Sequence, residues 1–347
     1  MSEMANVAAL ALVVCGSGCT TDVSGMPIFE QSDESGDAAT DTTTTTGEPE
    51  PDPPAGSSDD AAPMESSDGP DPDGFPDSPD IPEFSMPCEK VDVLFAIDSS
   101  GSMSTIQQNL IDNFPVFVTG LENKLADVDS YHIGVVSHDV YLFNEPEECQ
   151  GAGALITATG GENASGMVCG PYADGARYMT EADELTSAFE CTAQVGTDAS
   201  PAESQVGGVL LAVGDTHAEP GGCNEGFIRE DALLVVVIIT NEEDGGEFST
   251  IGGTPGDPPD WYEELVEVKG GIESNIVVLS LIGLEESLCA PQAPGVWEES
   301  IGLRIAEFTN MFTYGFVGDV CEPSYEGFLE EAVDVVDVAC INYIPVG

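Results

Sequence analysis

The chain has 347 residues, with 6 Lys and Arg against 65 Asp and Glu, so its formal net charge is -59. A surface with this charge repels phosphate backbones and anionic headgroups, which argues against nucleic-acid binding and electrostatic attachment to a membrane. The same surface attracts divalent cations. Hydrophobic residues make up 41% of the chain, which is enough for a substantial core.

The N-terminal residues have the features of an export signal. Residues 5–14 form an apolar run that is too short to span a bilayer and typical of a signal peptide. Cys15 and Cys19 follow among small residues, which resembles a bacterial lipoprotein signal, and Cys19, preceded by glycine, is the better candidate for lipidation. The alternative is a simple cleaved signal peptide. Both interpretations predict that residues 1–19 are a signal and that the protein is exported, either to the cell envelope, facing the periplasm or the outside, or into the medium.

Residues 20–87 have the composition of a disordered acidic linker. They are rich in Asp, Thr, Pro and Gly and contain no Lys or Arg. Such a segment buries too little apolar surface to offset the entropy of ordering. We expect a flexible tether before a folded domain at residues 88–347.

From Cys88 onward, apolar runs alternate with amphipathic patterns. Strands are expected at residues 91–97, 132–137, 233–239, 276–282 and 311–317, the last at an edge of the sheet. Helices are expected at residues 106–125, 180–191, 201–213, 258–268 and 325–339. The Gly-rich stretch around residues 140–180 indicates an insertion. This alternation predicts an α/β fold, with a doubly wound, mostly parallel sheet and helices on both faces.

One helix has a clear predicted start. Ser200 stands at the N-cap position, Pro201 at the first helical position and Glu203 at the third. We therefore expect the helix to begin at Pro201 and Glu203 to stabilise its first turn.

The cysteines of the folded domain indicate disulfides. No pair has the spacing C-x-x-C and the chain has 3 histidines, so a zinc cluster is a poor fit. Spread cysteines in an exported protein are typical of an oxidising compartment, and a bridge between Cys88 and Cys340, which bracket the domain, is favoured. The disulfide candidates are Cys88, Cys149, Cys169, Cys191, Cys223, Cys289, Cys321 and Cys340.

The first strand delivers the segment Asp98-Ser99-Ser100-Gly101-Ser102 to the carboxyl edge of the sheet, where doubly wound folds bind ligands. The carboxylate of Asp98 and the hydroxyls of Ser100 and Ser102 are the oxygen ligands that Mg²⁺ prefers. Gly101 is expected to permit a tight turn. One charged and two neutral ligands leave the ion an open position for an external carboxylate. The alternative for these residues is a capped helix N-terminus.

An apolar strand, Asp-x-Ser-x-Ser and an amphipathic helix together resemble the metal-ion-dependent adhesion site of von Willebrand factor A-type domains, over roughly residues 88–340. The resemblance implies a ligand threonine in a second loop, matched by Thr197, and an aspartate in a third loop. Asn241 stands in place of that aspartate, with Glu242 or Asp244 as substitutes. The resemblance also implies Mg²⁺, or Mn²⁺ or Ca²⁺, as the cofactor.

These features predict a non-enzymatic, metal-dependent binding or adhesion module, whose partner is a protein ligand with an exposed Asp or Glu. Contact with a membrane is expected only through the N-terminal lipid anchor. One alternative is a metal-free structural surface module, which would show no metal-dependent binding. The other is a phosphatase-like enzyme with Asp98 as nucleophile, which is less favoured because few cations exist to hold a phosphate.

Overall fold

The computed structural model describes residues 88–124, 128–198, 203–245, 252–285, 287 and 301–346. The predicted signal at residues 1–19 with Cys19, the predicted linker at residues 20–87, and Cys289 lie outside these residues.

The described residues form a 5-stranded sheet in which every pairing is parallel and the strand order is β2-β1-β3-β4-β5. The central strands consist mainly of apolar residues that are buried on both faces, as a parallel sheet between two helical layers requires. Every residue of β5 is partly exposed, as expected at an edge. The strands are β1 (Lys90–Ile97), β2 (Ser130–Ser137), β3 (Leu233–Ile239), β4 (Ile276–Ile282) and β5 (Tyr314–Asp319).

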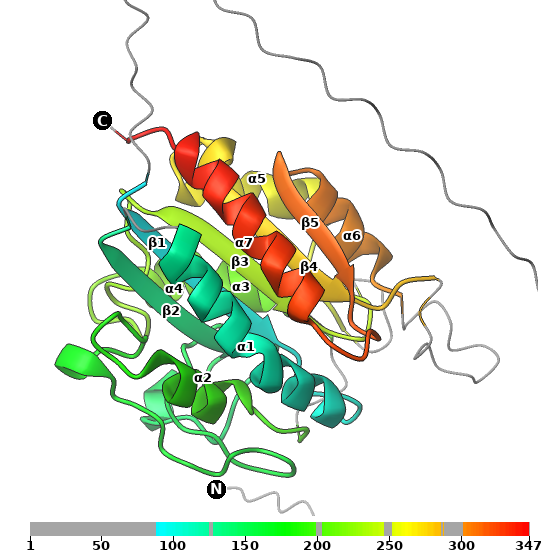
Figure 1. Cartoon of the computed structure of the whole chain (residues 1–347). Helices are drawn as coiled ribbons and strands as arrows, with labels where there is room; N and C mark the ends of the chain where they lie inside the picture. The colour runs from blue at the N-terminus through cyan, green and yellow to red at the C-terminus, as the bar shows by residue number, and fades with distance from the viewer. Residues whose placement is uncertain are drawn as a thin grey trace, which may run out of the picture. The chain divides into compact units, whose positions relative to one another are not determined.

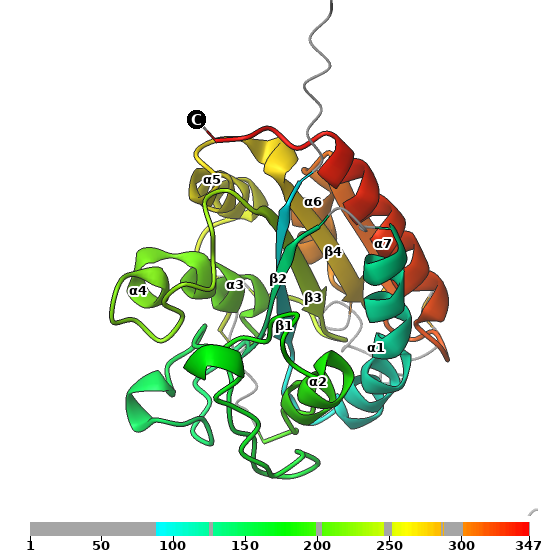
Figure 2. The same ribbon diagram turned by 60° about the vertical axis from the view of Figure 1, so that its left-hand side comes forward.

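Helices cover both faces of the sheet (Figures 1 and 2). Along β1, Val93 and Phe95 face the first layer, whereas Leu94 and Ala96 face the second. The first layer contains α1 (Ser104–Lys124), α2 (Leu185–Ala193) and α7 (Glu326–Ile341). The second contains α3 (Gln205–Val213), α5 (Pro258–Val268) and α6 (Leu303–Asn310), with the short α4 (Asp215–Ala218) beside α3. The predicted doubly wound α/β fold is confirmed. Among the helices described, none has the length and apolar character needed to cross a membrane.

The predicted start of α3 is wrong. Among the described residues the helix begins at Gln205, and residues 199–202 are not described. Its first free N–H groups are satisfied from a distant loop, because the Val206 N–H donates to the Asp244 carboxylate at 3.1 Å and the Gly207 N–H donates to the Thr254 hydroxyl at 2.6 Å. Glu203, which was expected in the first turn, lies before the helix and is buried.

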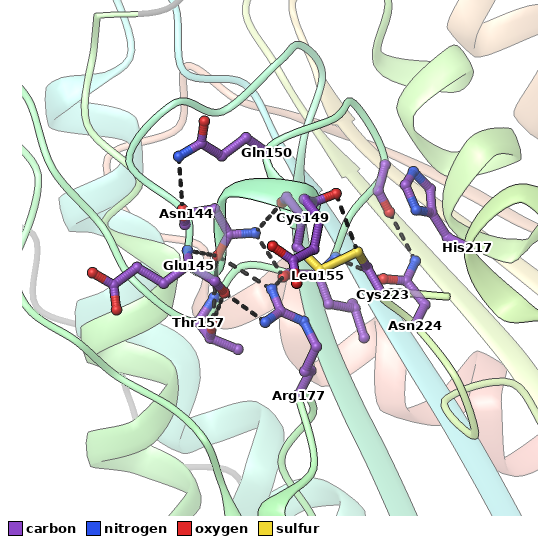
Figure 3. Close-up of a disulfide and its surroundings, with 12 residues drawn as sticks. Asn144, Glu145, Cys149, Gln150, Leu155, Thr157, Arg177, His217, Cys223 and Asn224 are labelled. Atoms are coloured by element: carbon purple, nitrogen blue, oxygen red, sulfur yellow. Dashed lines mark hydrogen bonds between the residues drawn. A yellow bond between two sulfur atoms is a disulfide. The ribbon is translucent and has the colours of Figure 1, made fainter. Parts of the chain in front are cut away.

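The segment between β2 and α2 contains the short helical turns η1 (Glu147–Cys149) and η2 (Ala173–Gly175). It also forms isolated β-bridges, between Ala158 and Val168 and between Met179 and Ile133 of β2. Hydrogen bonds from side chains to backbone carbonyls hold this segment together, as Figure 3 shows. The Asn144 amide donates to the carbonyls of Cys149 and Leu155, and the Arg177 guanidinium donates to the carbonyl of Leu155. These contacts satisfy buried carbonyls that a strand or helix would otherwise pair.

Disulfides close the fold at several points. The expected bridge between Cys88 and Cys340 is present, and it joins the residues before β1 to the end of α7 across a sequence separation of 252. Cys321 is also disulfide-bonded. The other described bridges join Cys149 to Cys223 and Cys169 to Cys191.

Candidate metal centre

The register of the sheet brings three loops to one edge. Ile97, the last residue of β1, pairs with Ser137 of β2 and with Ile239 of β3. Asp98, His138 and Thr240 are the next residues of these three strands. In the strand order, β2 lies on one side of β1 and β3 lies on the other, so the strand order reverses at β1. The carboxyl edge at this position is therefore the topological switch point, where such sheets bind ligands.

Asp98 is fully buried and is held by its own loop and by the loop that follows β3. Its Oδ1 accepts the Ser100 N–H at 2.6 Å, and its Oδ2 accepts the Thr240 hydroxyl at 2.7 Å. A carboxylate has about four acceptor positions, so Asp98 keeps lone pairs that can bind an ion.

Ser100, Ser102 and Asn241 place further oxygen atoms at this edge. The hydroxyl oxygens of Ser100 and Ser102 lie 3.5 Å apart, and the Ser102 hydroxyl donates to Asn241 Oδ1 at 3.0 Å. An octahedral ion with bonds of about 2.1 Å sets adjacent ligand oxygens about 3 Å apart. The spacing and the chemistry of these oxygen atoms therefore fit a small divalent cation. Of the five residues predicted to bind metal, the structure brings four together.

Thr197 is engaged elsewhere. Its hydroxyl donates to the Glu162 carbonyl at 3.2 Å and accepts the Asn163 side-chain N–H at 2.9 Å. Within the described parts of the chain no hydrogen bond joins it to the serines or to Asn241. Its role as a metal ligand stays a prediction.

Gln107 is a positioning residue that the sequence analysis missed. The side chain is buried in the first turns of α1, donates to the carbonyls of Asp98 at 2.8 Å and Gly196 at 2.9 Å, and accepts the Gly196 N–H at 3.1 Å. It thereby holds the loop of Thr197 against the loop of Asp98. A signal was present, because three buried apolar residues lie three or four positions from Gln107 in the sequence: Met103, Leu110 and Ile111.

Replacing Gln107 by leucine is expected to lower the free energy of unfolding by about 2–4 kcal/mol, because it leaves buried backbone groups unpaired. Urea unfolding followed by circular dichroism measures the loss. Gln108→Leu is the matched control, because Gln108 is exposed and bonds Asp112 on the same helix, and it should cost less than about 0.5 kcal/mol. Equal losses in the two variants would contradict the positioning role.

The turn at Gly101 does not need glycine. Its φ lies outside the left-handed range, and a Cβ there would meet no atom within 4 Å. The tight turn expected at Gly101 therefore does not depend on the conformational freedom of glycine, and α1 begins three residues later, at Ser104.

The substitutes considered for Asn241 have different surroundings. Asp244 is buried and accepts the N–H and the hydroxyl of Thr254 in addition to the N–H of Val206, so it caps α3 and anchors the next loop. Glu242 instead contacts the Glu203 carboxyl.

A second cluster lies beneath this edge, formed by Asp98, His138 and Glu203. The side chains of His138 and Glu203 are both 0% exposed, and His138 Nδ1 lies 3.5 Å from Asp98 Oδ1. Burial, together with the negative charges of Asp98 and Glu242, raises the pKa of Glu203 to about 10. His138 was not predicted as a ligand, because 3 histidines and the absence of a C-x-x-C pair made a zinc cluster a poor fit.

An open groove of about 570 Å³ adjoins this edge of the sheet. Ser102 and Asn241 form part of its wall, and the start of α1 and the loop between β5 and α7 form the rest. The groove leaves room for a ligand beside Ser102 and Asn241.

Comparison with known proteins finds matches among solved structures. No protein-family model matches the chain, and no curated protein matches it. A von Willebrand factor type A protein from Catenulispora acidiphila is 16% identical over 73% of this chain and 42% of that chain, with a TM-score of 0.35. The pilus adhesin SpaC from Lactobacillus rhamnosus GG is 12% identical over 72% of this chain and 30% of that chain, with a TM-score of 0.38.

The manganese-loaded TRAP protein of Plasmodium vivax is 15% identical over 73% of this chain and 74% of that chain, with a TM-score of 0.33. The chain thus spans less than half the length of the first two matches and about three quarters of the third. This chain is similar in structure to proteins with a von Willebrand factor A-type domain, the family that its segment from Asp98 to Ser102 resembles.

Proposed function

We propose that the chain is a non-enzymatic binding module that holds a divalent cation at Asp98, Ser100, Ser102 and Asn241. The observation that supports this most directly is the contact between the first and third loops, in which Ser102 lies 3.0 Å from Asn241 Oδ1. Two loops that are far apart in sequence contribute neutral oxygens beside one buried carboxylate, Asp98. Thr197, whose loop Gln107 holds against Asp98, is the proposed contribution of the second loop.

The charge of the ligands favours an acidic partner. One carboxylate and several neutral oxygens leave a bound divalent ion with net positive charge, and asparagine at position 241 makes the site less negative than aspartate would. The ion then supplies a Lewis-acidic position for a carboxylate of another molecule. We infer that a protein with an exposed Asp or Glu binds there and that the groove beside Ser102 contacts the residues around that carboxylate.

The all-oxygen set favours Mg²⁺, with Mn²⁺ or Ca²⁺ as alternatives. The disulfides support an oxidising compartment. We propose that the protein acts outside the cytoplasm, on the cell envelope through a lipid on Cys19 or after secretion.

Calorimetric titration of the full chain with Mg²⁺ tests the metal site. Wild-type protein should bind the ion, and Ser100→Ala combined with Ser102→Ala should weaken binding at least tenfold, because it removes two oxygen ligands. Ser104→Ala is the matched control, since Ser104 is exposed at the start of α1, and its affinity should equal that of the wild type.

Acetate is the probe for the open position. With Mn²⁺ bound, acetate should displace water from the ion and lower the water-proton relaxation rate, whereas chloride at the same ionic strength should not. Unchanged Mg²⁺ affinity in the double serine variant, or equal effects of acetate and chloride, would overturn the proposal.

A further inference from the structure

The buried cluster of Asp98, His138 and Glu203 has an excess of negative charge with no cation beside it. Every Lys and Arg side chain that the structure describes is engaged elsewhere. Lys90 pairs with Asp231, Arg177 binds carbonyls of the insertion, Arg229 pairs with Asp92, Lys269 donates to the Arg229 carbonyl, and Arg304 pairs with Asp257. Buried carboxylates without a counterion are costly, so the cluster requires bound protons or a bound cation.

His138 has an unpartnered atom that faces this charge. Its Nε2 is buried, has no hydrogen-bond partner and lies 3.9 Å from Glu203 Oε2. That separation is too long for a hydrogen bond. A tetrahedral ion with bonds of about 2.0–2.1 Å sets its ligand atoms about 3.3 Å apart, so an ion shared by Nε2 and Oε2 would draw these two atoms together by about half an ångström.

The remaining contacts orient these side chains. Asp98, His138 and Glu203 each offer a ligand atom, and these atoms all lie within 4.8 Å of one another. Glu203 Oε2 accepts the Gln205 side-chain N–H at 2.6 Å, and the Oε1 of Gln205 is buried and unpartnered. From its other side the histidine is fixed at Nδ1, which accepts the Ser99 N–H at 3.3 Å and lies 3.5 Å from Asp98 Oδ1. A metal ion at Nε2 would replace the ring proton there, and the proton would pass to Nδ1, from which the ring would donate to Asp98 Oδ1 in place of the Ser99 contact.

We propose that Asp98, His138 and Glu203 form a second, buried cation site that takes a transition-metal ion, with Zn²⁺ as the best fit. An imidazole nitrogen beside carboxylate oxygens suits Zn²⁺, whereas Mg²⁺ prefers oxygen ligands and retains water. This site does not depend on the ligand-binding role proposed above, although the two sites share Asp98. A cation here would fix the loop before α3 and the end of β2 beneath the ligand-binding edge.

The test uses the full chain and Zn²⁺ as the probe. Metal-free protein is dialysed against Zn²⁺ in the presence of a chelator of moderate affinity, so that weak binding to the many surface carboxylates is suppressed, and bound metal is counted by mass spectrometry. Wild-type protein should retain one equivalent of Zn²⁺. His138→Asn and Glu203→Gln should each weaken retention at least tenfold, and His217→Asn is the matched control that should leave it unchanged.

A second readout reports the ligand directly. The chain contains 3 histidines, so ¹⁵N-histidine labelling gives a small set of ring signals that the variants assign. Zn²⁺ should shift the ring nitrogens of His138 and leave those of His132 and His217 in place. If His138→Asn does not fold, the isosteric Glu203→Gln still tests the site.

The two proposals fail differently. If the combined Ser100→Ala and Ser102→Ala change loses Mg²⁺ binding and keeps the Zn²⁺ equivalent, both sites exist. If those changes also remove the Zn²⁺, or if the His138 ring signals do not move, the buried site is overturned. If Zn²⁺ is retained by His138 while Mg²⁺ affinity is insensitive to both serines, the buried site stands and the proposed function falls.

Discussion

Replacing Cys88 and Cys340 together by alanine is expected to lower the free energy of unfolding by about 5 kcal/mol. The bridge closes a loop with a sequence separation of 252, and a crosslink of that span strongly restricts the unfolded chain. It also ties the start of β1, which carries Asp98 at its far end, to the last turn of α7. Urea unfolding under non-reducing conditions measures the loss.

The bridge between Cys169 and Cys191 is the matched control. Its sequence separation is 22, so the same loop-entropy argument gives about 3 kcal/mol for its removal. A larger loss for this short bridge than for the long one would contradict the loop-length explanation.

Replacing Arg229 by methionine is expected to lower the free energy of unfolding by about 3–5 kcal/mol, because it leaves a buried carboxylate without its partner. Asp92 is 0% exposed in the central strand β1. Its Oδ1 accepts the Arg229 Nε–H at 2.7 Å, and its Oδ2 accepts the Arg229 backbone N–H at 2.7 Å. Lys90→Met is the control, because it breaks a pair whose side chains are 35% and 62% exposed and should cost less than about 1 kcal/mol.

The Arg229→Met deficit should depend on pH. Burial raises the pKa of Asp92 from its ordinary value of 3.8 to about 6, and Arg229 partly offsets the rise. The folded state therefore binds this proton more tightly than the unfolded state, so the carboxyl lowers stability as the pH rises through that range. Without Arg229 the pKa of Asp92 rises further, and the deficit should be larger at about pH 7 than at about pH 5. Equal deficits at the two pH values would assign the loss to packing instead of charge.

The sequence by itself determined the fold class, because strand burial leaves a local pattern. The apolar runs at residues 233–239 and 276–282 coincide with β3 and β4 as the structure has them. Such runs bury both faces of a strand, which is typical of a parallel sheet between helices. The start of α5 was also local, since the Asp257 N–H donates to the Asp260 carboxylate at 2.9 Å, three residues away.

The sequence determined part of the candidate site for the same reason. The proposed metal ligands Asp98, Ser100 and Ser102 lie within five consecutive positions after a strand, so one turn is enough to bring their oxygen atoms together. Asn241 was found as the first residue beyond Thr240 at the end of the next strand in the sheet. Its contact with Ser102 spans 139 residues, and Asn241 was predicted from the resemblance to von Willebrand factor A-type domains, which implies a ligand in the loop after that strand.

Only the tertiary structure decided the rest. α3 begins at Gln205 because Asp244 and Thr254 cap it from another loop, which overrides the local signal at Ser200 and Pro201. His138 and Glu203 meet Asp98 because of the strand register and the path of the loop before α3. Polar contacts of this kind depend on the positions of distant backbone segments. A single polar residue forms no periodic pattern in the sequence from which such a contact could be predicted.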